Sequence, residues 1–335
     1  MSSLRQVGLA VITMTALVAC GTGDKPAGNG QGTNVTYLTS FNTFGRDAYA
    51  FVAQEKGFFA EAGVNTTIKP GTGTVDVLKL VAAGTAQFGI ADSTASMITM
   101  TREKLPVTAV AAIHQRTVAA IMSLDGNGIG KPADLVGKKI GDQPGSTNQV
   151  MFPMYAKAAG IDASKVQWVP SPPPNLPQLL VAGQVDGIGQ FVVGKPLIEA
   201  AARNRKAVVL PYGELLPDLY GNVLVTSKDL AAKNPDLVRK FSGALLKGLR
   251  YSLDHPDELG RILRKHQPTQ DPGVAAAEMR LMAPFAKPDG FTGPLGALEE
   301  KRVEKIIHLL TEAGAIPASA LTPAGAADFA LAPKS

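Results

Sequence analysis

Short apolar runs alternate along the chain with longer segments in which apolar residues recur every three or four positions. The short runs predict β-strands, and the longer segments predict amphipathic helices. Strands are expected at residues 35–39, 65–69, 88–91, 107–113, 139–141, 166–170 and 187–191. Helices are expected between several of them, at 47–62, at 75–83 and in the segment that opens at 144–148. Strands that are regularly separated by helices are typical of an α/β fold.

The last third of the chain has a different pattern, because helical spacing dominates it from Asp229 onward. Pro256 begins one of these helices and is followed by two acidic residues, which the positive end of a helix dipole favours. A last helix is expected at 298–313, ended by Gly314 and Pro317.

Two segments about a hundred residues apart resemble each other. "LVAAGTAQFGIAD" at 80–92 and "LLVAGQVDGIGQF" at 179–191 both run from the end of an apolar helix through Ala-Gly and a polar turn into a buried strand. The repetition predicts two lobes built alike. A chance match is the alternative, because junctions of helix, glycine and strand recur in α/β proteins.

The first 34 residues are unlike the rest. Arg5 is the only charged residue before Cys20, and residues 7–18 form an apolar run, shorter than the roughly 20 apolar residues of a membrane-spanning helix. A basic N-terminus, a short apolar run and small residues before a cleavage site predict an export signal over 1–19. Leu-Val-Ala-Cys, ending at Cys20, resembles the bacterial lipobox, in which the cysteine is lipidated after cleavage. Residues 20–34 would then be the lipidated end and a flexible glycine-rich tether.

Cys20 is the only cysteine among 335 residues, so a disulfide within one chain is excluded. A buried structural cysteine is the alternative to lipidation, but no core position is expected between a leader and a Gly/Asn-rich tract. Hydrophobic residues at 45% and charged residues at 18% indicate a globular body, long enough for two lobes, in which no second segment could cross a membrane. The net charge of +5 is dispersed, and no basic block predicts a nucleic-acid partner.

Motifs of enzyme chemistry are missing from the sequence. No two of its four histidines, His114, His255, His266 and His308, have the spacing of a metal site. "DGNGIGKP" at 125–132 lacks the first glycine and the Ser/Thr of a phosphate-binding loop, and the Gly-x-Gly pairs lack the rest of a dinucleotide fingerprint. No metal, cofactor or catalytic residue is therefore expected.

Several segments, taken in their order and spacing, resemble a known family. "VAQEKGFFAEAGV" at 52–64 and "GKKIG" at 137–141 are the most specific of them. From Val35 to about Leu310 the chain is similar to the solute-binding proteins of bacterial ABC importers. In particular it resembles the branch that serves thiamine-precursor pyrimidines, alkanesulfonates, taurine, nitrate and riboflavin.

This resemblance implies the periplasmic-binding-protein type 2 fold. In it, two α/β lobes are joined by two crossing strands and close on a ligand held in the cleft between them. Lobe one is expected to comprise 35–123 and 225–335, and lobe two 124–222. The closed form would dock, as a monomer, on a permease that works with an ATPase.

Ligands of open α/β sheets bind beyond the carboxyl ends of the strands. At the position of Phe41, after the first strand, the pyrimidine-binding branch has a tryptophan that stacks on the ring; phenylalanine can stack but donates no N–H. Thr43 and Asp47 stand where that branch has a proline and a histidine. Core packing of Phe41 and Phe44 is the alternative to a place in the cleft.

Other candidate residues lie where helices begin, because free backbone N–H groups there bind anions or polar edges of a ligand. Such starts are expected at 71–74, at 92–93 and at 144–148. The start at 144–148 is where the sulfonate and nitrate branches hold their anion. Gln115 resembles a ligand-contacting position of the family. Simple helix capping is the alternative for Asp92 and Ser146. The expected ligand contacts are Phe41, Asn42, Phe44, Gly73, Thr74, Asp92, Ser93, Gln115, Ser146, Thr147, Asn148, Phe191, Tyr220 and Asn222.

The sequence thus predicts a solute-binding protein without catalysis, held outside the cytoplasm on the cell membrane by a lipid on Cys20. Its solute is expected to be a planar heterocycle, such as a pyrimidine or a flavin precursor, or a sulfonate- or nitrate-type anion. A pyrimidine synthase on the same scaffold is the alternative, although it needs a cysteine cluster and the chain has no cysteine after position 20. A third hypothesis is that the protein is a ligand-sensing lipoprotein without a transporter.

Overall fold

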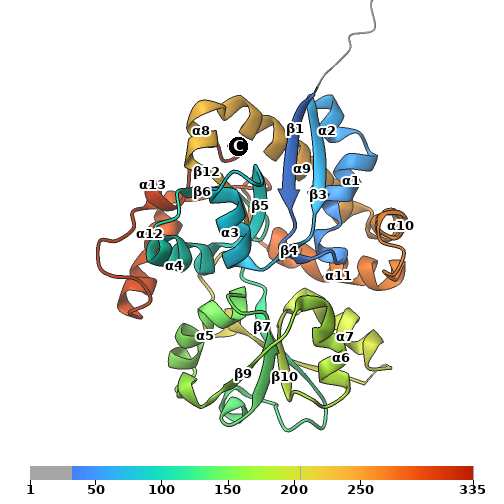
Figure 1. The fold of residues 1–335 in the computed structure, drawn as a ribbon, viewed down its shortest axis with the longest axis vertical. Helices are drawn as coiled ribbons and strands as arrows, with labels where there is room; N and C mark the ends of the chain where they lie inside the picture. Colours follow the sequence, from blue (N-terminus) through green and yellow to red (C-terminus); the bar gives the residue numbers. More distant parts are fainter. Residues whose placement is uncertain (1–31, 204, 335) are drawn as a thin grey trace, which may run out of the picture. The chain divides into compact units, whose positions relative to one another are not determined.

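The structure, a computed structural model, describes residues 32–203 and 205–334. The predicted export signal, the lipidation site Cys20 and nearly all of the tether lie outside this part. Two five-stranded sheets organise it, with helices packed against both of them (Figure 1).

The first sheet has the strand order β3-β1-β5-β12-β6. β1 is parallel to β3 and β5, whereas β12 is antiparallel to its neighbours β5 and β6. The bounds are β1 (Thr33–Leu38), β3 (Val64–Lys69), β5 (Phe88–Asp92), β6 (Val107–Ala112) and β12 (Asn222–Ser227).

The second sheet, of order β9-β8-β10-β7-β11, repeats this plan: β8 is parallel to β9 and β10, and β7 is antiparallel to β10 and β11. The bounds are β7 (Ala119–Leu124), β8 (Lys139–Asp142), β9 (Gln167–Pro170), β10 (Gly187–Phe191) and β11 (Ala207–Pro211). The two similar sequence segments end in β5 and β10, the middle strands of the two sheets. The interpretation of the repetition as two similar α/β units is therefore confirmed.

The chain passes between the sheets twice, after β6 and before β12, and the two crossings are hydrogen-bonded to each other. Thr117 N donates to Leu219 O at 2.9 Å, and Gly221 N donates to His114 O at 3.2 Å. The predicted boundaries at 123 and 225 lie inside strands, because all of β7 pairs in the second sheet and all of β12 in the first. Because β7 and β12 are paired along their whole lengths, the crossings between the sheets lie near 113–118 and 212–221.

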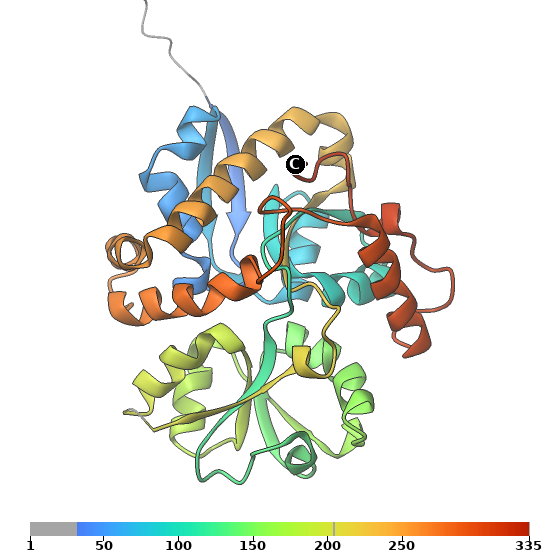
Figure 2. The ribbon, with the colours of Figure 1, turned by 180° about the vertical axis from the view of Figure 1, so that it is seen from behind.

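Helices surround each sheet, and α9 crosses one face of the first sheet when the molecule is seen from behind (Figure 2). There the ring of Phe241 stacks on Phe88 of the middle strand, with centroids 4.1 Å apart. The helices are α1 (Tyr49–Glu55), α2 (Phe58–Glu61), α3 (Thr74–Ala82), α4 (Ser93–Glu103), α5 (Thr147–Ala158), α6 (Leu176–Val181), α7 (Lys195–Ala201), α8 (Lys228–Lys233), α9 (Pro235–Asp254), α10 (Pro256–His266), α11 (Pro272–Ala286), α12 (Glu300–Glu312) and α13 (Pro323–Ala326).

The single helix expected at 47–62 is wrong. A 3-10 turn, Gly45–Asp47, comes first, and α1 and α2 are then separated at Gly57, whose φ of 76° is left-handed and cannot continue a helix. Between β3 and α3 lies β4 (Gly71–Thr72), which pairs with β2 (Phe41–Asn42) in a small separate sheet.

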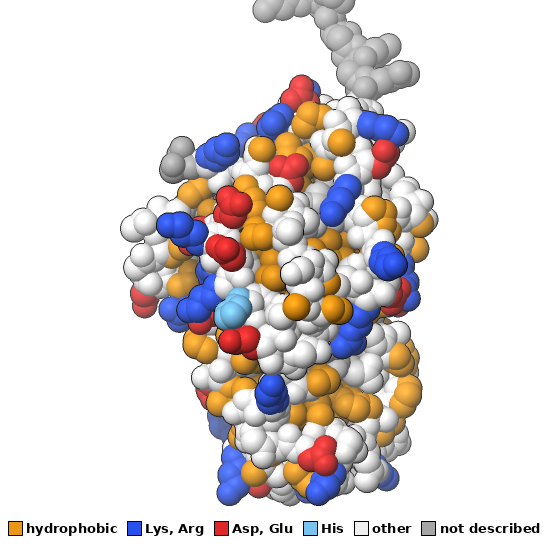
Figure 3. All heavy atoms as spheres, turned by 90° about the vertical axis from the view of Figure 1, so that its left-hand side faces the viewer, with side chains coloured by type: hydrophobic (Ala, Val, Ile, Leu, Met, Phe, Trp, Pro, Cys, Tyr) orange, Lys and Arg blue, Asp and Glu red, His pale blue; other side chains and the backbone are white. Residues whose placement is uncertain are grey.

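The surface drawn in Figure 3 intersperses basic and acidic side chains, without a large area of one sign. Within the described ranges, no helix is both long and apolar enough to cross a membrane. The same residues contain no group of three or more side chains placed to hold a metal ion.

Candidate functional site

A small cavity lies between the carboxyl ends of strands from both sheets. Its lining comes from the loop after β1, the start of α3, the start of α5 and the end of β10. The lining residues are Ser40, Phe41, Gly73, Ser146, Thr147, Asn148, Gln190 and Phe191. The cavity measures about 10 Å³, and a single water needs at least about 10–15 Å³. This cavity is therefore too small for a solute with the lobes placed as they are in the structure.

Phe41 reaches the cavity from β2, and two hydrogen bonds fix its loop. The Thr39 hydroxyl donates to Asn42 O and accepts from Gly71 N at 3.0 Å. Phe41 is only 7% exposed and packs, with Phe44, in a hydrophobic cluster whose other fully buried members come from the second lobe. The two alternatives for Phe41, a cleft residue or a core residue, therefore both hold. Asn42 is half-buried, has a left-handed φ of 58°, and does not line the cavity.

The start of α5 brings three expected residues into the cavity wall, but each of them also has a structural partner. Ser146 caps the helix by accepting from Gln149 N at 3.1 Å, and it donates to Asp142. The side-chain carbonyl of Asn148 accepts from Ala120 N at 3.0 Å. Thr147 contacts the other lobe, where its hydroxyl lies 2.8 Å from the hydroxyl of Thr74.

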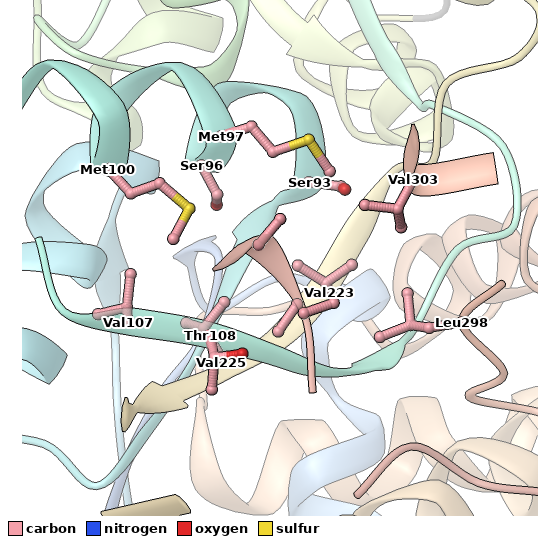
Figure 4. Close-up of a pocket in the computed structure, with 13 residues that line it drawn as sticks. Ser93, Ser96, Met97, Met100, Val107, Thr108, Val223, Val225, Leu298 and Val303 are labelled. Carbon is pink, nitrogen blue, oxygen red and sulfur yellow. The ribbon is translucent and has the colours of Figure 1, made fainter. Parts of the chain in front are cut away.

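Asp92 and Ser93 stand behind this contact rather than in the cavity. Asp92 caps α4 by accepting from Ala95 N at 2.9 Å, so the capping role left open by the sequence is present. Burial raises the pKa of Asp92 to about 7, against the effect of the backbone N–H donors. Ser93 lines a different space, a void of about 10 Å³ inside the first lobe (Figure 4). Apolar side chains, including Met97 and Met100, point into that void, which is a packing gap of the core.

Gln115 and Tyr220 lie near Arg302 and away from the cavity lining. Arg302 donates to both the side-chain and the backbone oxygen of Gln115, and its guanidinium lies 3.8 Å from the centroid of the Tyr220 ring. Gln115 also donates to Ala297 O at 3.0 Å. These bonds hold the crossing segments against the C-terminal helices. Neither Gln115 nor Tyr220 lines the cavity, and neither do Phe44, Thr74 and Asn222.

Two carboxyl groups next to the cavity accept hydrogen bonds from loop and helix-cap residues. Burial raises the pKa of Asp142, at the end of β8, to about 7, while its hydrogen bonds from Ser146 and Gln143 act in the opposite direction. A side chain at Gly189 would collide with this carboxyl group, because a Cβ there would lie 1.9 Å from Asp142 Oδ2. Asp47, the second group, accepts from Ser40 N at 3.1 Å and from the Ser40 hydroxyl at 2.8 Å.

Sequence reasoning missed four residues around this site, among them Ser40, which lines the cavity. Gln190 lines the cavity and accepts from the backbone N–H of Phe191 at 2.8 Å. Arg46 and Glu278 are buried close by, with Glu278 Oε2 accepting from Arg46 N at 3.1 Å. The spacing of 232 positions between them leaves no local signal for this pairing.

Comparisons with known proteins agree with this architecture. The formylaminopyrimidine-binding protein of Halalkalibacterium halodurans is 24% identical over 265 residues, which cover 78% of this chain and 80% of that protein. The 4-amino-5-hydroxymethyl-2-methylpyrimidine phosphate synthase of Legionella pneumophila is 24% identical over 238 residues, 70% of this chain and 74% of that enzyme.

Among solved structures, the alkanesulfonate-binding protein SsuA of Xanthomonas axonopodis pv. citri, bound to MOPS, superposes with a TM-score of 0.70. The alignment covers 88% of this chain and 97% of that protein at 15% identity, which shows the fold alone. The expected two-lobed fold of periplasmic binding proteins is thereby confirmed. A profile of the family described as NMT1/THI5 like matches residues 47–259. This match spans more than half of the 335 residues, and the chain therefore belongs to the NMT1/THI5-like family.

Proposed function

We propose that the protein captures a small extracytoplasmic solute between its two lobes and delivers it to an ABC permease, and that a lipid on Cys20 holds it at the cell membrane. The cavity between the strand ends of both sheets is the observation that carries this proposal. Closure of the lobes around this cavity is the motion by which a binding protein traps its ligand.

The lining of the cavity favours a planar, polar solute. Phe41 from the first lobe and Phe191 from the second both line it, and aromatic rings provide large apolar contacts for a flat ring. Ser40, Thr147 and Gln190 add hydroxyl and amide groups that can bond to ring substituents. A formylaminopyrimidine, the solute named for one relative, has these properties.

A synthase is the second candidate, because relatives of similar identity carry that name. The cavity lining argues against it: the eight residues there include no cysteine, histidine, lysine or carboxylate that could serve as nucleophile or general base. The position that resembles the family's histidine holds Asp47, whose carboxyl group is bonded to Ser40. We infer binding without catalysis.

The proposal is tested by measuring the melting temperature of the purified full chain with formylaminopyrimidine, riboflavin, MOPS or nitrate. One of these solutes should raise the melting temperature in a saturable way, since a ligand that binds only the folded state stabilises it. The same solute should be recovered chemically unchanged after incubation. Conversion of the solute would favour the synthase, and the lack of any stabilisation by the panel would contradict the binding function.

A further inference from the structure

Buried polar atoms without hydrogen-bond partners are concentrated beside the cavity. In the described part of the chain twelve such side-chain atoms occur, and six of them belong to Arg46, Asp47, His114 and Glu278. Buried polar groups in native proteins are nearly always bonded, so a cluster of exceptions indicates a missing ligand or water.

Arg46 is the centre of this cluster. Its side chain is about 1% exposed, and none of its three guanidinium nitrogens makes a hydrogen bond. Nε lies 3.7 Å from Asp47 Oδ2, and Nη1 lies 3.7 Å from Glu278 Oε1. These distances allow charge attraction but exceed the range of a hydrogen bond.

Each of the two carboxyl groups faces Arg46 with one oxygen and is held through the other. Asp47 is held through Oδ1 by the backbone and hydroxyl of Ser40, and Glu278 is held through Oε2 by the backbone N–H of Arg46. They stabilise the position of the guanidinium and leave its N–H donors free. His114 supplies a further unbonded group, because its Nδ1 accepts from Asn222 N while its Nε2 has no partner.

Two aromatic rings lie beside the guanidinium of Arg46, and one of them, Phe191, also lines the cavity. The guanidinium carbon lies 4.5 Å from the centroid of the Phe44 ring and 5.0 Å from that of Phe191. Phe191 and Ser40 line the cavity and also belong to the surroundings of Arg46. Phe191 ends β10 of the second sheet, whereas Arg46 belongs to the first lobe. Separation of the lobes would therefore take the Phe191 ring off the guanidinium, whereas Phe44, which belongs to the same lobe as Arg46, would stay beside it.

We propose that Arg46 selects the solute, by donating hydrogen bonds from its guanidinium to a carbonyl oxygen of a neutral planar ligand. This inference rests on the proposed binding function. A neutral acceptor satisfies the free donors without adding charge, whereas an anion would meet the carboxyl groups of Asp47 and Glu278 at the same place in a buried environment. The solute thus belongs to the carbonyl-bearing heterocycles and not to free sulfonates or nitrate.

Calorimetric titration of the full chain with formylaminopyrimidine, its deformylated amine, riboflavin, MOPS and nitrate tests this. Arg46→Lys keeps the charge but loses the planar fork of donors. It should weaken the binding of the carbonyl-bearing solute at least tenfold. Wild type should bind formylaminopyrimidine more tightly than its deformylated amine, and Arg46→Lys should lose this preference. If the role of Arg46 were purely structural, the preference would be the same in both proteins.

Arg239→Lys is the control, because Arg239 is an exposed arginine that donates to Asp236 within α9 and does not line the cavity; the affinity of this variant should equal that of wild type. Unchanged affinity of Arg46→Lys for the carbonyl-bearing solute would remove Arg46 from the site and leave the binding function intact. Preference of wild type for MOPS or nitrate would overturn the ligand class but not solute binding. Binding of no solute in the panel would overturn both proposals.

Discussion

The hydroxyl oxygens of Thr74 and Thr147 lie 2.8 Å apart and form a hydrogen bond between the two lobes. Thr74 also accepts from Asp92 N at 3.0 Å, so its own proton is free to go to Thr147. Beside this pair, Val75 N donates to Gly145 O at 3.4 Å. The starts of α3 and α5 thus meet next to the cavity and hold the cleft closed.

Thr147→Val should shift the protein without ligand toward an open form. Valine keeps the shape of threonine but removes the hydroxyl, and one such bond is worth about 1 kcal/mol. X-ray scattering of the full chain should show a larger radius of gyration, and saturating solute should restore the wild-type value. Thr101→Val, which removes a hydroxyl bonded to Met97 O within α4, is the control. An identical scattering profile for wild type and Thr147→Val would show that this bond does not hold the lobes together.

Cys20→Ala should detach the protein from the membrane or leave it uncut. The basis is the lipobox-like sequence before Cys20 and the lack of any other cysteine. Fractionation of cells and mass spectrometry of the mature N-terminus measure the outcome. A Cys20→Ala protein that remains in the membrane fraction with the normal mature N-terminus would refute lipidation.

Local patterns predicted much of the fold, because the strands of each sheet alternate with helices and carry apolar runs. The strands β7, β11 and β12 were missed. β7 and β12 are buried on both faces, and such a run cannot be told from a buried helix by periodicity. β7 follows a strand of the first sheet but pairs in the second, and β12 follows a strand of the second sheet but pairs in the first. This long-range pairing has no local signal in the sequence.

The candidate site was predicted in part for the same reason. The loop positions after strands led to Phe41, Gly73, Phe191 and 146–148, which do line one cavity; as ligand contacts they stay predictions. Gln115, expected from the family resemblance, and Tyr220, expected near the returning crossing, do not line it; Arg302, from a helix far along the chain, lies against both. Arg46 is a charged residue next to a glycine, and nothing in this local sequence indicated that its side chain would be buried.

Phe41→Ala should reduce both stability and affinity. The ring lines the cavity and also packs among buried residues of the second lobe, so its removal leaves a void in the interface between the lobes. Loss of a buried phenylalanine costs about 3–5 kcal/mol, and the lower end is expected at an interface that can open. Calorimetric titration and melting of the protein without ligand measure the two effects, and Phe41→Trp should retain binding. Full affinity in Phe41→Ala would exclude the ring from the ligand site.

Stability should respond to pH through the buried carboxyl groups, of which Asp142 is the most direct to test. Burial raises its folded-state pKa to about 7, far above the ordinary value near 4. Between these values the folded chain binds a proton that the unfolded chain lacks, so the contribution of Asp142 is fully present below about pH 4 and is lost as pH rises through 7. One pKa unit corresponds to about 1.4 kcal/mol. From pH 5 to pH 7, Asp142→Asn should therefore gain about 2 kcal/mol of unfolding free energy relative to wild type.

Urea unfolding of wild type and Asp142→Asn at several pH values measures this difference. His114 acts in the opposite direction in both proteins, because burial and, to a smaller extent, the charge of Arg46 lower its pKa to about 3. Below about pH 6.5 the unfolded chain therefore takes up a proton there that the folded chain does not, and comparison of the two proteins cancels this effect. Asp162→Asn is the control, because Asp162 is exposed and has its pKa lowered by hydrogen bonds from Ser164, so it should show no such gain between pH 5 and 7. Parallel stability curves for wild type and Asp142→Asn would mean that Asp142 ionises at its ordinary pKa, with water reaching its carboxyl group in the cleft.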